Sequence, residues 1–481
     1  MADLSTGFPS NLAFKLKQLS SFTKSIVRCT PDRSSVNMGE QTRIKLPSQG
    51  LIDFRTLTIY ADATCTGGAT YYYHFPRYWS SLIRQMTITA NGVQLANINE
   101  YGLLYNTLHD LESADISKAS KRSLERYDPS ITYRSDATQA TNTAIIASKS
   151  AAWTTTAASN DTNEKLCINN FIGILGSLST PCLDLNLVGD VYLDIYWNNA
   201  SVLFGSSYTA IPNPYANAAW SLSNIRLTCS RINFGNSDYY SLIADKLTAQ
   251  EPLLIGFYDY FFARGTTTQK SSTIGMNFNL NTNSLDQCIF TLQHGDYSSI
   301  YPLILPAAAD TTAASAGVKS FSQVLADPTT YTGVAGTATN YDVAFNNSYY
   351  FKRCGNDIDK AQWTINSVNV SPYPRELIEI FNEVLTAIGN VSDDKTIGGL
   401  HQGITSLWAF AKCYFTDILS LENISGDGEF WRSGLDSKSS TINIQYNATF
   451  NGANTQAVSP IIFCRSTKIL SINEGRLLSV F

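Results

Sequence analysis

The sequence is poor in charge, and it lacks the patterns that mark several common protein classes. Only 15% of its 481 residues are Asp, Glu, Lys or Arg, against about 25% in an average soluble protein. The net charge of −5 argues against sequence-specific nucleic-acid binding, which needs a basic surface. The first ten residues carry no secretory signal pattern. The apolar stretch at residues 406–415 contains Lys412 and is too short to span a bilayer. We therefore expect a soluble protein made in a cytosol.

Signs of catalytic or metal chemistry are also missing. The nine cysteines are scattered and never form C-x-x-C, which favours free, buried thiols in a reducing compartment. None of the four histidines has metal-ligand spacing, and we expect His109, on a predicted helix, to be structural. No nucleophile-elbow, P-loop or dinucleotide-binding motif occurs, and the acidic stretches "SGDGEF" and "GNDIDK" match no calcium loop. The sequence predicts no catalytic, cofactor-binding or metal residues, and no enzyme.

What the sequence has in quantity is alternation of apolar and polar residues, with 44% hydrophobic and 12% aromatic residues to build a core. Residues 442–448 place apolar side chains on one face, and residues 183–187 and 191–197 repeat the pattern. Such strands are typical of antiparallel sheets packed face to face. Residues 112–165 and 306–340 lack core periodicity, and we expect them to form long insertion loops, the first with a short helix near residues 116–127.

One segment predicts a hairpin followed by a helix. Residues 88–108 read "ITANGVQLANINEYGLLYNTL", and Asn91-Gly92 is the strongest short hairpin signal. A two-residue turn pairs Ala90 with Val93 and Ile88 with Leu95. The chain then enters a helix near Asn99, a favourable N-cap. The expected apolar stripe of this helix is Tyr101, Leu104, Tyr105, Leu108 and Leu111.

A similar segment recurs at residues 363–385, "WTINSVNVSPYPRELIEIFNEVL". Asn366-Ser367 stands 275 positions after Asn91-Gly92, and the expected pairs are Ile365 with Val368 and Trp363 with Val370. Pro374 suits the first turn of the following helix, and Gly389 suits its end. The expected apolar stripe is Leu377, Ile378, Phe381, Val384, Leu385 and Ile388. Chance recurrence of a common unit is one explanation, but the matching turn, face and helix register favour two related domains.

The repeat predicts a tandem architecture. We expect an N-terminal arm at residues 1–25, one domain at 26–240 and a second at 241–481, with the junction near residues 238–250. Two all-β domains of this length, with short helices and long insertion loops, indicate a pair of eight-stranded jelly-roll sandwiches.

The order of several segments resembles the double jelly-roll major capsid proteins, and among these the proteins of virophages and polinton-like viruses most. In the first half the matching segments are residues 44–60, 88–108, 183–197 and 220–232. In the second half they are residues 277–293, 363–385 and 433–452. No single motif is diagnostic, and the resemblance covers most of the chain after about residue 25.

This resemblance implies a structural protein of the virion, made in the host cytoplasm. Three chains would form a homotrimer, a pseudo-hexameric capsomer of six sandwiches, and capsomers would tile the icosahedral shell of a double-stranded DNA virus. It also implies contacts with neighbouring capsomers and with penton and minor capsid proteins.

Two alternatives stay open on the residues alone. The basic N-terminal segment, with Lys15, Lys17, Lys24 and Arg28, fits a solvated tail, or an arm laid against an anionic inner surface, a partner or a membrane face. The aromatic segment "TYYYHFPRYW" at residues 70–79 would suit stacking on sugars in a two-domain carbohydrate-binding or adhesive protein, or a glycosidase. The capsid interpretation assigns those aromatics to the core and interfaces.

Overall fold

The protein is described from a computed structural model. The structure describes these residues: 22–67, 72–76, 78–111, 164–180, 182–207, 218–234, 238–248, 252–268, 272–295, 297–298, 301–304, 348–355, 358–387, 407, 410–411, 414–422, 434–436, 441–451, 457–473 and 477–480. The predicted insertion loops and the segment "SGDGEF" fall almost entirely outside these residues.

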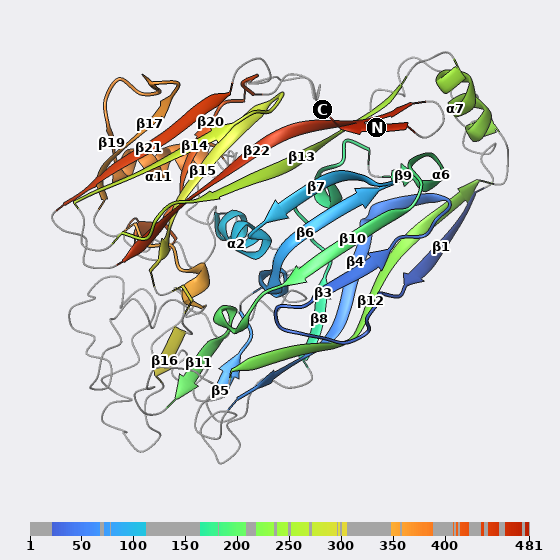
Figure 1. Cartoon of the computed structure of the whole chain (residues 1–481), viewed down its shortest axis with the longest axis horizontal. Coiled ribbons are helices and arrows are strands. Elements are labelled where there is room, and N and C mark those ends of the chain that lie inside the picture. The colour runs from blue at the N-terminus through green and yellow to red at the C-terminus, as the bar shows by residue number, and fades with distance from the viewer. Residues whose placement is uncertain are drawn as a thin grey trace, which may run out of the picture.

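The first half of the chain folds into two packed antiparallel sheets (Figure 1). One has the order β1 (Phe22–Cys29), β12 (Ala219–Phe234), β4 (Leu51–Thr66) and β8 (Glu164–Ile168). Two short strands extend it, β2 (Val36–Asn37) beside β12 and β9 (Cys182–Asp184) beside β4. The other sheet has the order β3 (Gln41–Lys45), β10 (Val191–Trp197), β6 (Ile83–Ala90) and β7 (Val93–Asn99).

The second half repeats this arrangement. Its first sheet has the order β13 (Leu253–Arg264), β22 (Val458–Asn473), β15 (Leu285–His294) and β20 (Asp417–Ser420), with β23 (Leu477–Val480) beside β22. Its second sheet has the order β14 (Thr273–Leu280), β21 (Ile442–Phe450), β17 (Ile358–Ile365) and β18 (Val368–Asn369), with β19 (Arg375–Glu376) beside β17.

The strand order is therefore the same in both halves. Counted along each half, the first, eighth, third and sixth main strands form one sheet, and the second, seventh, fourth and fifth form the other. This is the two-sheet plan of a jelly roll, and the prediction of two tandem jelly-roll sandwiches is confirmed. The domain boundaries at residues 25 and 240 stay predictions, although α7 (Asp238–Thr248) connects β12 to β13.

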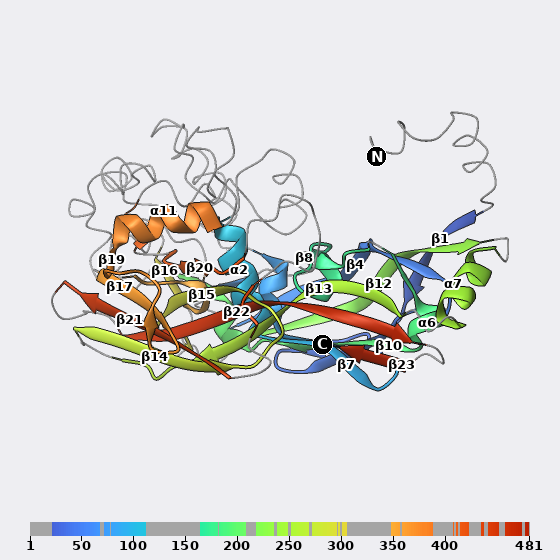
Figure 2. The same cartoon turned by 90° about the horizontal axis from the view of Figure 1, so that it is seen from above.

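Helices occupy equivalent places in the two halves. α2 (Tyr101–Leu111) follows β7, and α11 (Leu377–Ala387) follows β18 and β19. Both lie on the same side of the sheets (Figure 2). The remaining helices are short: η1 (Trp79–Leu82), α5 (Ile174–Ser177), α6 (Leu185–Val188), η2 (Ala200–Val202) and η3 (Tyr349–Phe351). No helix in the described part of the chain is long and apolar enough to cross a membrane.

A third, small sheet ties the halves together. β11 (Phe204–Ser207) pairs with β5 (Tyr72–His74) of its own half and, in parallel, with β16 (Tyr301–Ile304) of the other half. Because both halves supply strands to one sheet, the sandwiches are joined at this end of the molecule as well as along their flanks (Figure 1).

The predicted hairpin turns are confirmed, but one strand register is wrong. Asn91 and Gly92 both have positive φ, as do Asn366 and Ser367, which is the type I′ geometry. Ala90 pairs with Val93 as expected, whereas Ile88 faces Ala96 rather than Leu95. A bulge at this point makes Leu95 an extra residue, so that Leu95 and Ala96 are both buried.

In the second hairpin the predicted register holds and the predicted burial fails. Ile365 pairs with Val368, and the Val370 N–H donates to the Trp363 carbonyl at 3.0 Å. Trp363 is buried, but Val368 and Val370 remain 69% and 44% exposed. The strand that lines a buried face in the first half is thus an open edge in the second.

Two further expectations needed correction. Residues 185–188 form a helical turn rather than a strand, because the Asp184 carboxylate accepts a hydrogen bond from the Asn186 N–H and caps that turn. Among the α11 side chains that the structure describes, the fully buried apolar ones are Ile380 and Val384, while the predicted stripe residue Ile378 is 54% exposed. The Leu385 side chain and Ile388, also predicted for the stripe, lie outside the description. The predicted alternation of residues 442–448 in β21 is confirmed.

Candidate functional site

The functional candidate is the surface along which the two sandwiches pack, here called the seam. The first half contributes α2, β7 and α5, and the second half contributes β13, η3 and Arg353. The sequence predicts no catalytic or ligand-binding residue, so there is no predicted site to locate in the structure. Sequence reasoning missed the residues that hold the seam together, because the partners lie far apart in the chain.

The helix α2 forms the centre of the seam. Ten of its eleven residues are buried, including polar Asn106, Thr107, His109 and Asp110. A helix buried on every side must have cover on every side. Its own half covers it through η1 and β6, and the second half covers it through η3. The sequence therefore makes a helix with a wide apolar surface, and the neighbouring sandwich completes its burial.

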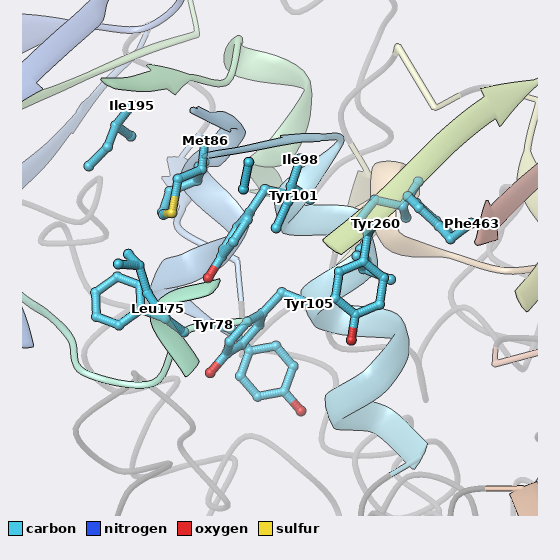
Figure 3. Close-up of a cluster of buried hydrophobic side chains, with 14 of the residues drawn as sticks. Tyr78, Met86, Ile98, Tyr101, Tyr105, Leu175, Ile195, Tyr260 and Phe463 are labelled. Carbon is cyan, nitrogen blue, oxygen red and sulfur yellow. The ribbon is translucent and has the colours of Figure 1, made fainter. Parts of the chain in front are cut away.

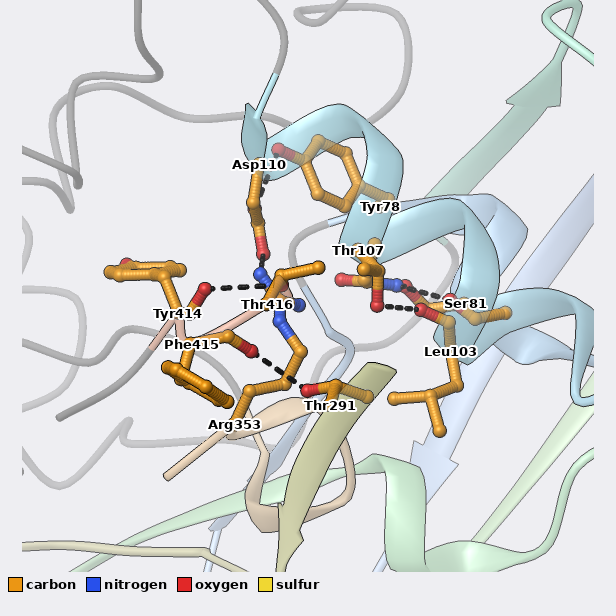
Figure 4. Close-up of polar contacts among 12 residues, drawn as sticks. Tyr78, Ser81, Leu103, Thr107, Asp110, Thr291, Arg353, Tyr414, Phe415 and Thr416 are labelled. Atoms are coloured by element: carbon orange, nitrogen blue, oxygen red, sulfur yellow. Dashed lines mark hydrogen bonds and ion pairs between the residues drawn. The ribbon is translucent and has the colours of Figure 1, made fainter. Parts of the chain in front are cut away.

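An ion pair inside the seam connects the halves (Figure 4). Arg353 donates from Nη2 to the Asp110 Oδ2 at 3.0 Å, and the two side chains are 0% and 2% exposed. The Tyr78 hydroxyl donates to the other Asp110 oxygen at 3.3 Å. The Arg353 backbone is fixed by bridges to Gln293 and Tyr414. A buried charge without its ion-pair partner is energetically unfavourable. The Arg353–Asp110 pair therefore couples the position of α2 to the second sandwich.

A second polar cluster lies where β7 ends. Glu100 precedes α2 with a positive φ of 52° and accepts a hydrogen bond from the Tyr350 hydroxyl of the second half. The Arg264 Nη2 lies 3.5 Å from the other Glu100 oxygen. Burial, and then the negative charge of Glu100, raise the pKa of Tyr350 well above its ordinary value, so Tyr350 stays a neutral donor. In both clusters the first half supplies the acid and the second half the cation.

The edge of β13 is covered by the first half. The Ser179 hydroxyl accepts from the Gly256 N–H at 3.0 Å, and the Ser179 N–H donates to the Gly256 carbonyl at 2.8 Å. The Ser177 hydroxyl accepts from the Tyr258 N–H at 2.8 Å. An unpaired strand edge is a template for association with other strands, and these bonds remove that possibility for β13.

Apolar packing supplies the rest of the seam (Figure 3). The ring centroid of Tyr105 lies 5.8 Å from that of Tyr78 and 6.3 Å from that of Tyr101. These three rings and Tyr260 of β13 are buried and belong to one hydrophobic cluster. A groove of ≈ 380 Å³ remains between β7 and β13, with Asp259 and Lys468 on its wall. The Lys468 Nζ lies 2.6 Å from the Asp259 Oδ2. Burial raises the pKa of Asp259, and the nearby lysine opposes that rise.

The aromatic segment that suggested sugar stacking is largely interior. Tyr73, Phe75, Tyr78 and Trp79 are each at most 2% exposed. Side chains that are enclosed in this way are not presented to a glycan. The described part of residues 70–79 therefore agrees with the assignment of these aromatics to the core.

The structure also locates the side chains of two of the four histidines considered for metal chemistry. His109 lies on α2, 3.1 Å from the Asn170 side chain, and His294 stacks on Tyr349 with ring centroids 4.4 Å apart. His401 lies outside the described residues, and so does the side chain of His74. Within the described ranges, no cluster of three or more His, Cys, Asp or Glu residues could hold a metal ion. The absence of an enzymatic activity and of a cofactor stays a prediction.

The basic N-terminal segment is only partly visible. Lys24 and Arg28 lie on β1 and are exposed, whereas Lys15 and Lys17 lie outside the described residues. β1 pairs with β12 over its whole length, so these two residues belong to the sandwich rather than to a tail. A contact of the arm with an inner surface stays a prediction.

Comparison with known proteins identifies the fold. No protein-family model matches the chain, and no curated protein sequence does. Among solved structures, a quasi-atomic model of the PBCV-1 virus capsid aligns over 96% of this chain and 97% of its own, with a TM-score of 0.56 and 14% identity. A PBCV-1 VP54 crystal structure fitted into the virophage Sputnik aligns over 96% and 97%, with a TM-score of 0.54 and 13% identity. The Sputnik virophage structure aligns over 96% and 88%, with a TM-score of 0.52 and 11% identity. This chain has the double jelly-roll fold of those capsid proteins.

Proposed function

We propose that this chain is the major capsid protein of an icosahedral double-stranded DNA virus. The observation that carries the proposal is the repeated strand order, with both sandwiches aligned over 96% of the chain to a capsid structure. At identities of 14% or less such a likeness supports the fold alone, and the proposed function rests on what this fold can do mechanically.

The mechanics follow from the seam. Two rigid sandwiches, held side by side by a buried ion pair and joined again by the β5–β11–β16 sheet, make one stiff block. Three such blocks around an axis present six sandwiches, close to a hexagon, and hexagonal units tile flat facets. Trimer contacts of this kind are obligate and bury about 2,000–5,000 Å². Contacts between trimers are expected to be smaller and more polar, so that errors of assembly are reversible.

The role assigned to the chain is structural. Its partners are two further copies of itself, neighbouring capsomers, and penton and minor capsid proteins, and its location is the virion shell. The basic arm ahead of β1 is assigned to the inner surface, where it meets anionic material without reading a base sequence. No reaction is assigned to any residue.

The test is the state of the purified full chain. Light scattering should give the mass of three chains, and this mass should persist on dilution because the interface is obligate. At high concentration the trimers should form hexagonal arrays in negative stain. A chain that stays monomeric at every concentration and binds a glycan resin would overturn the proposal in favour of a carbohydrate-binding protein.

A further inference from the structure

The doubled fold gives each surface of one half a counterpart in the other. β12 and β22 have equal lengths, and their pairing registers place Ile26 of β1 where Gly256 of β13 stands. By strand order β7 corresponds to β18, and α2 corresponds to α11. The seam is therefore a contact between one half's helix side and the other half's first strand. Within the described part of one chain, one copy of each surface has no counterpart packed against it.

The unmatched helix side lies on the second half, and we call it the outer face: Val368, Val370, Tyr373, Glu376 and Ile378. Its four apolar residues are 44–69% exposed, and they are half of the eight large exposed hydrophobic residues among the described positions. At the positions that correspond by turn and helix register, Val93 is half-buried, and Leu95 and Gly102 are buried. An exposed apolar cluster of this kind marks an interaction site.

The unmatched first strand is β1, whose exposed residues Lys24, Ile26 and Arg28 we call the β1 face. Ile26 is 80% exposed, the highest value among the exposed large hydrophobic residues. Among the described strands β1 pairs only with β12, so its other edge has no strand beside it. The matching edge of β13 is covered by Ser177 and Ser179. One edge is covered and its counterpart is open.

Charge has the same polarity at both places. In the seam the first half carries the acids Glu100 and Asp110, and the second half carries Arg264 at the end of β13 and Arg353 just after η3. On the unmatched surfaces Glu376 takes the place of Glu100, just before the helix, and the β1 face carries Lys24 and Arg28. The two unmatched surfaces are thus complementary in sign as well as apolar.

We propose that the outer face of one copy binds the β1 face of the next copy, head to tail, in the arrangement that the seam shows within one chain. The two faces lie at opposite ends of the molecule (Figure 1), so one chain cannot join them to each other. A heterologous contact of this kind generates a ring when its rotation closes. The inference rests on the proposed trimer and names the surfaces that build it.

The experiment uses variants that each damage one face of the full chain. The double variant Val368→Asp with Ile378→Asp damages the outer face, and Ile26→Asp damages the β1 face. Leu435→Asp is the matched control, since Leu435 is 38% exposed and belongs to neither face. Because all these side chains are exposed, the variants should keep the circular dichroism and monomer stability of the parent. Glu376→Lys is a milder second probe of the outer face.

Light scattering distinguishes the outcomes. We expect each face variant alone to have the mass of one chain, and an equimolar mixture of the two to have the mass of two chains, since only one intact contact is possible. Leu435→Asp should keep the mass of three chains, and Glu376→Lys should shift dissociation to at least tenfold higher protein concentration. Face variants that keep the mass of three chains, or monomers that fail to pair on mixing, overturn the surface assignment and leave the trimer standing. A parent chain that is itself monomeric overturns the proposed function.

Discussion

The two halves share a strand order but use their equivalent helices differently. α2 is enclosed, and its Asp110 is paired with an arginine of the other half. α11 has one covered side, and the buried Arg375 in front of it pairs with Asp417 of the same half at 2.7 Å. The comparison shows that the repeat sets where a helix stands, whereas the neighbour determines how much of it is buried.

The largest expected effect comes from breaking the link between the halves. Arg353→Ala leaves the Asp110 carboxylate buried without its cation, and such losses cost about 3–5 kcal/mol. Chemical denaturation of the monomeric Ile26→Asp background should show this loss of unfolding free energy. The control is Lys45→Ala, which removes an ion pair with Asp190 in which both side chains are solvent-exposed, at 43% and 47%. It should change the free energy of unfolding far less, because the Asp190 carboxylate stays in contact with water. Equal effects of the two substitutions would contradict the account of the seam.

The next prediction compares the helices directly. Leu104→Ala in α2 opens a cavity at a fully buried position and should cost about 2–5 kcal/mol in the same monomeric background. Ile378→Ala in α11 removes a side chain that is 54% exposed and should change monomer stability by less than about 0.5 kcal/mol. In the trimer Ile378→Ala should instead weaken association. A destabilised Ile378→Ala monomer would mean that α11 is covered within one chain.

A smaller effect is expected at the two hairpin turns. Gly92 has φ +81°, and a Cβ there would meet nothing within 4 Å, so Gly92→Ser tests the backbone alone. Ser367 occupies the same turn position with φ 66°. Gly92→Ser should lower the free energy of unfolding by about 0.5–1 kcal/mol, and Ser367→Gly should raise it by a similar amount. The reason is that glycine adopts a positive φ without a steric penalty. Thermal unfolding of the two single variants measures both signs.

The smallest effects are pH dependences of opposite sign. A hydrogen bond from Arg55 lowers the pKa of Asp53 below its ordinary value of 3.8, whereas burial raises the pKa of Asp259 above 3.8. The stabilisation from Asp53 is present above pH 3.8 and is lost as the pH falls through its folded pKa. The folded state binds the Asp259 proton more tightly than the unfolded state does, so protonated Asp259 stabilises the fold at low pH. This stabilisation is lost as the pH rises from 3.8 through the folded pKa.

Asn variants test these signs. The unfolding free energy of the parent, measured relative to that of Asp53→Asn, should fall on acidification. Measured relative to that of Asp259→Asn, it should fall as the pH rises above 3.8. Urea midpoints between pH 3 and 6 supply the comparison. Slopes of the same sign for both pairs would show that the two carboxylates have similar surroundings.

Much of the fold follows from local sequence signals. The turns at Asn91-Gly92 and Asn366-Ser367 and the alternation of β21 depend on short-range geometry, and the structure agrees with them. The predicted register at Leu95 was wrong because a β-bulge places an extra residue in β7 opposite β6, which no local pattern reveals. The four residues 185–188 alternate like a strand, but the Asp184 cap turns them into a helix.

The seam was beyond the reach of sequence reasoning. Arg353 and Asp110 are 243 positions apart, and an isolated "KRC" gives no sign of a buried cation. The same limit explains Ile378. The apolar arc of α11 is wider than the side that one chain covers, so a rule that buries every apolar residue placed Ile378 inside. In the trimer proposed here that residue is covered by the next copy.

The most direct test of the central claim is an image of the purified particle along its axis. Negative-stain class averages of the parent chain should show six lobes of similar size around a centre, with three equivalent pairs. Averages with only two lobes at every concentration, or with a twofold arrangement of the pairs, would contradict the account.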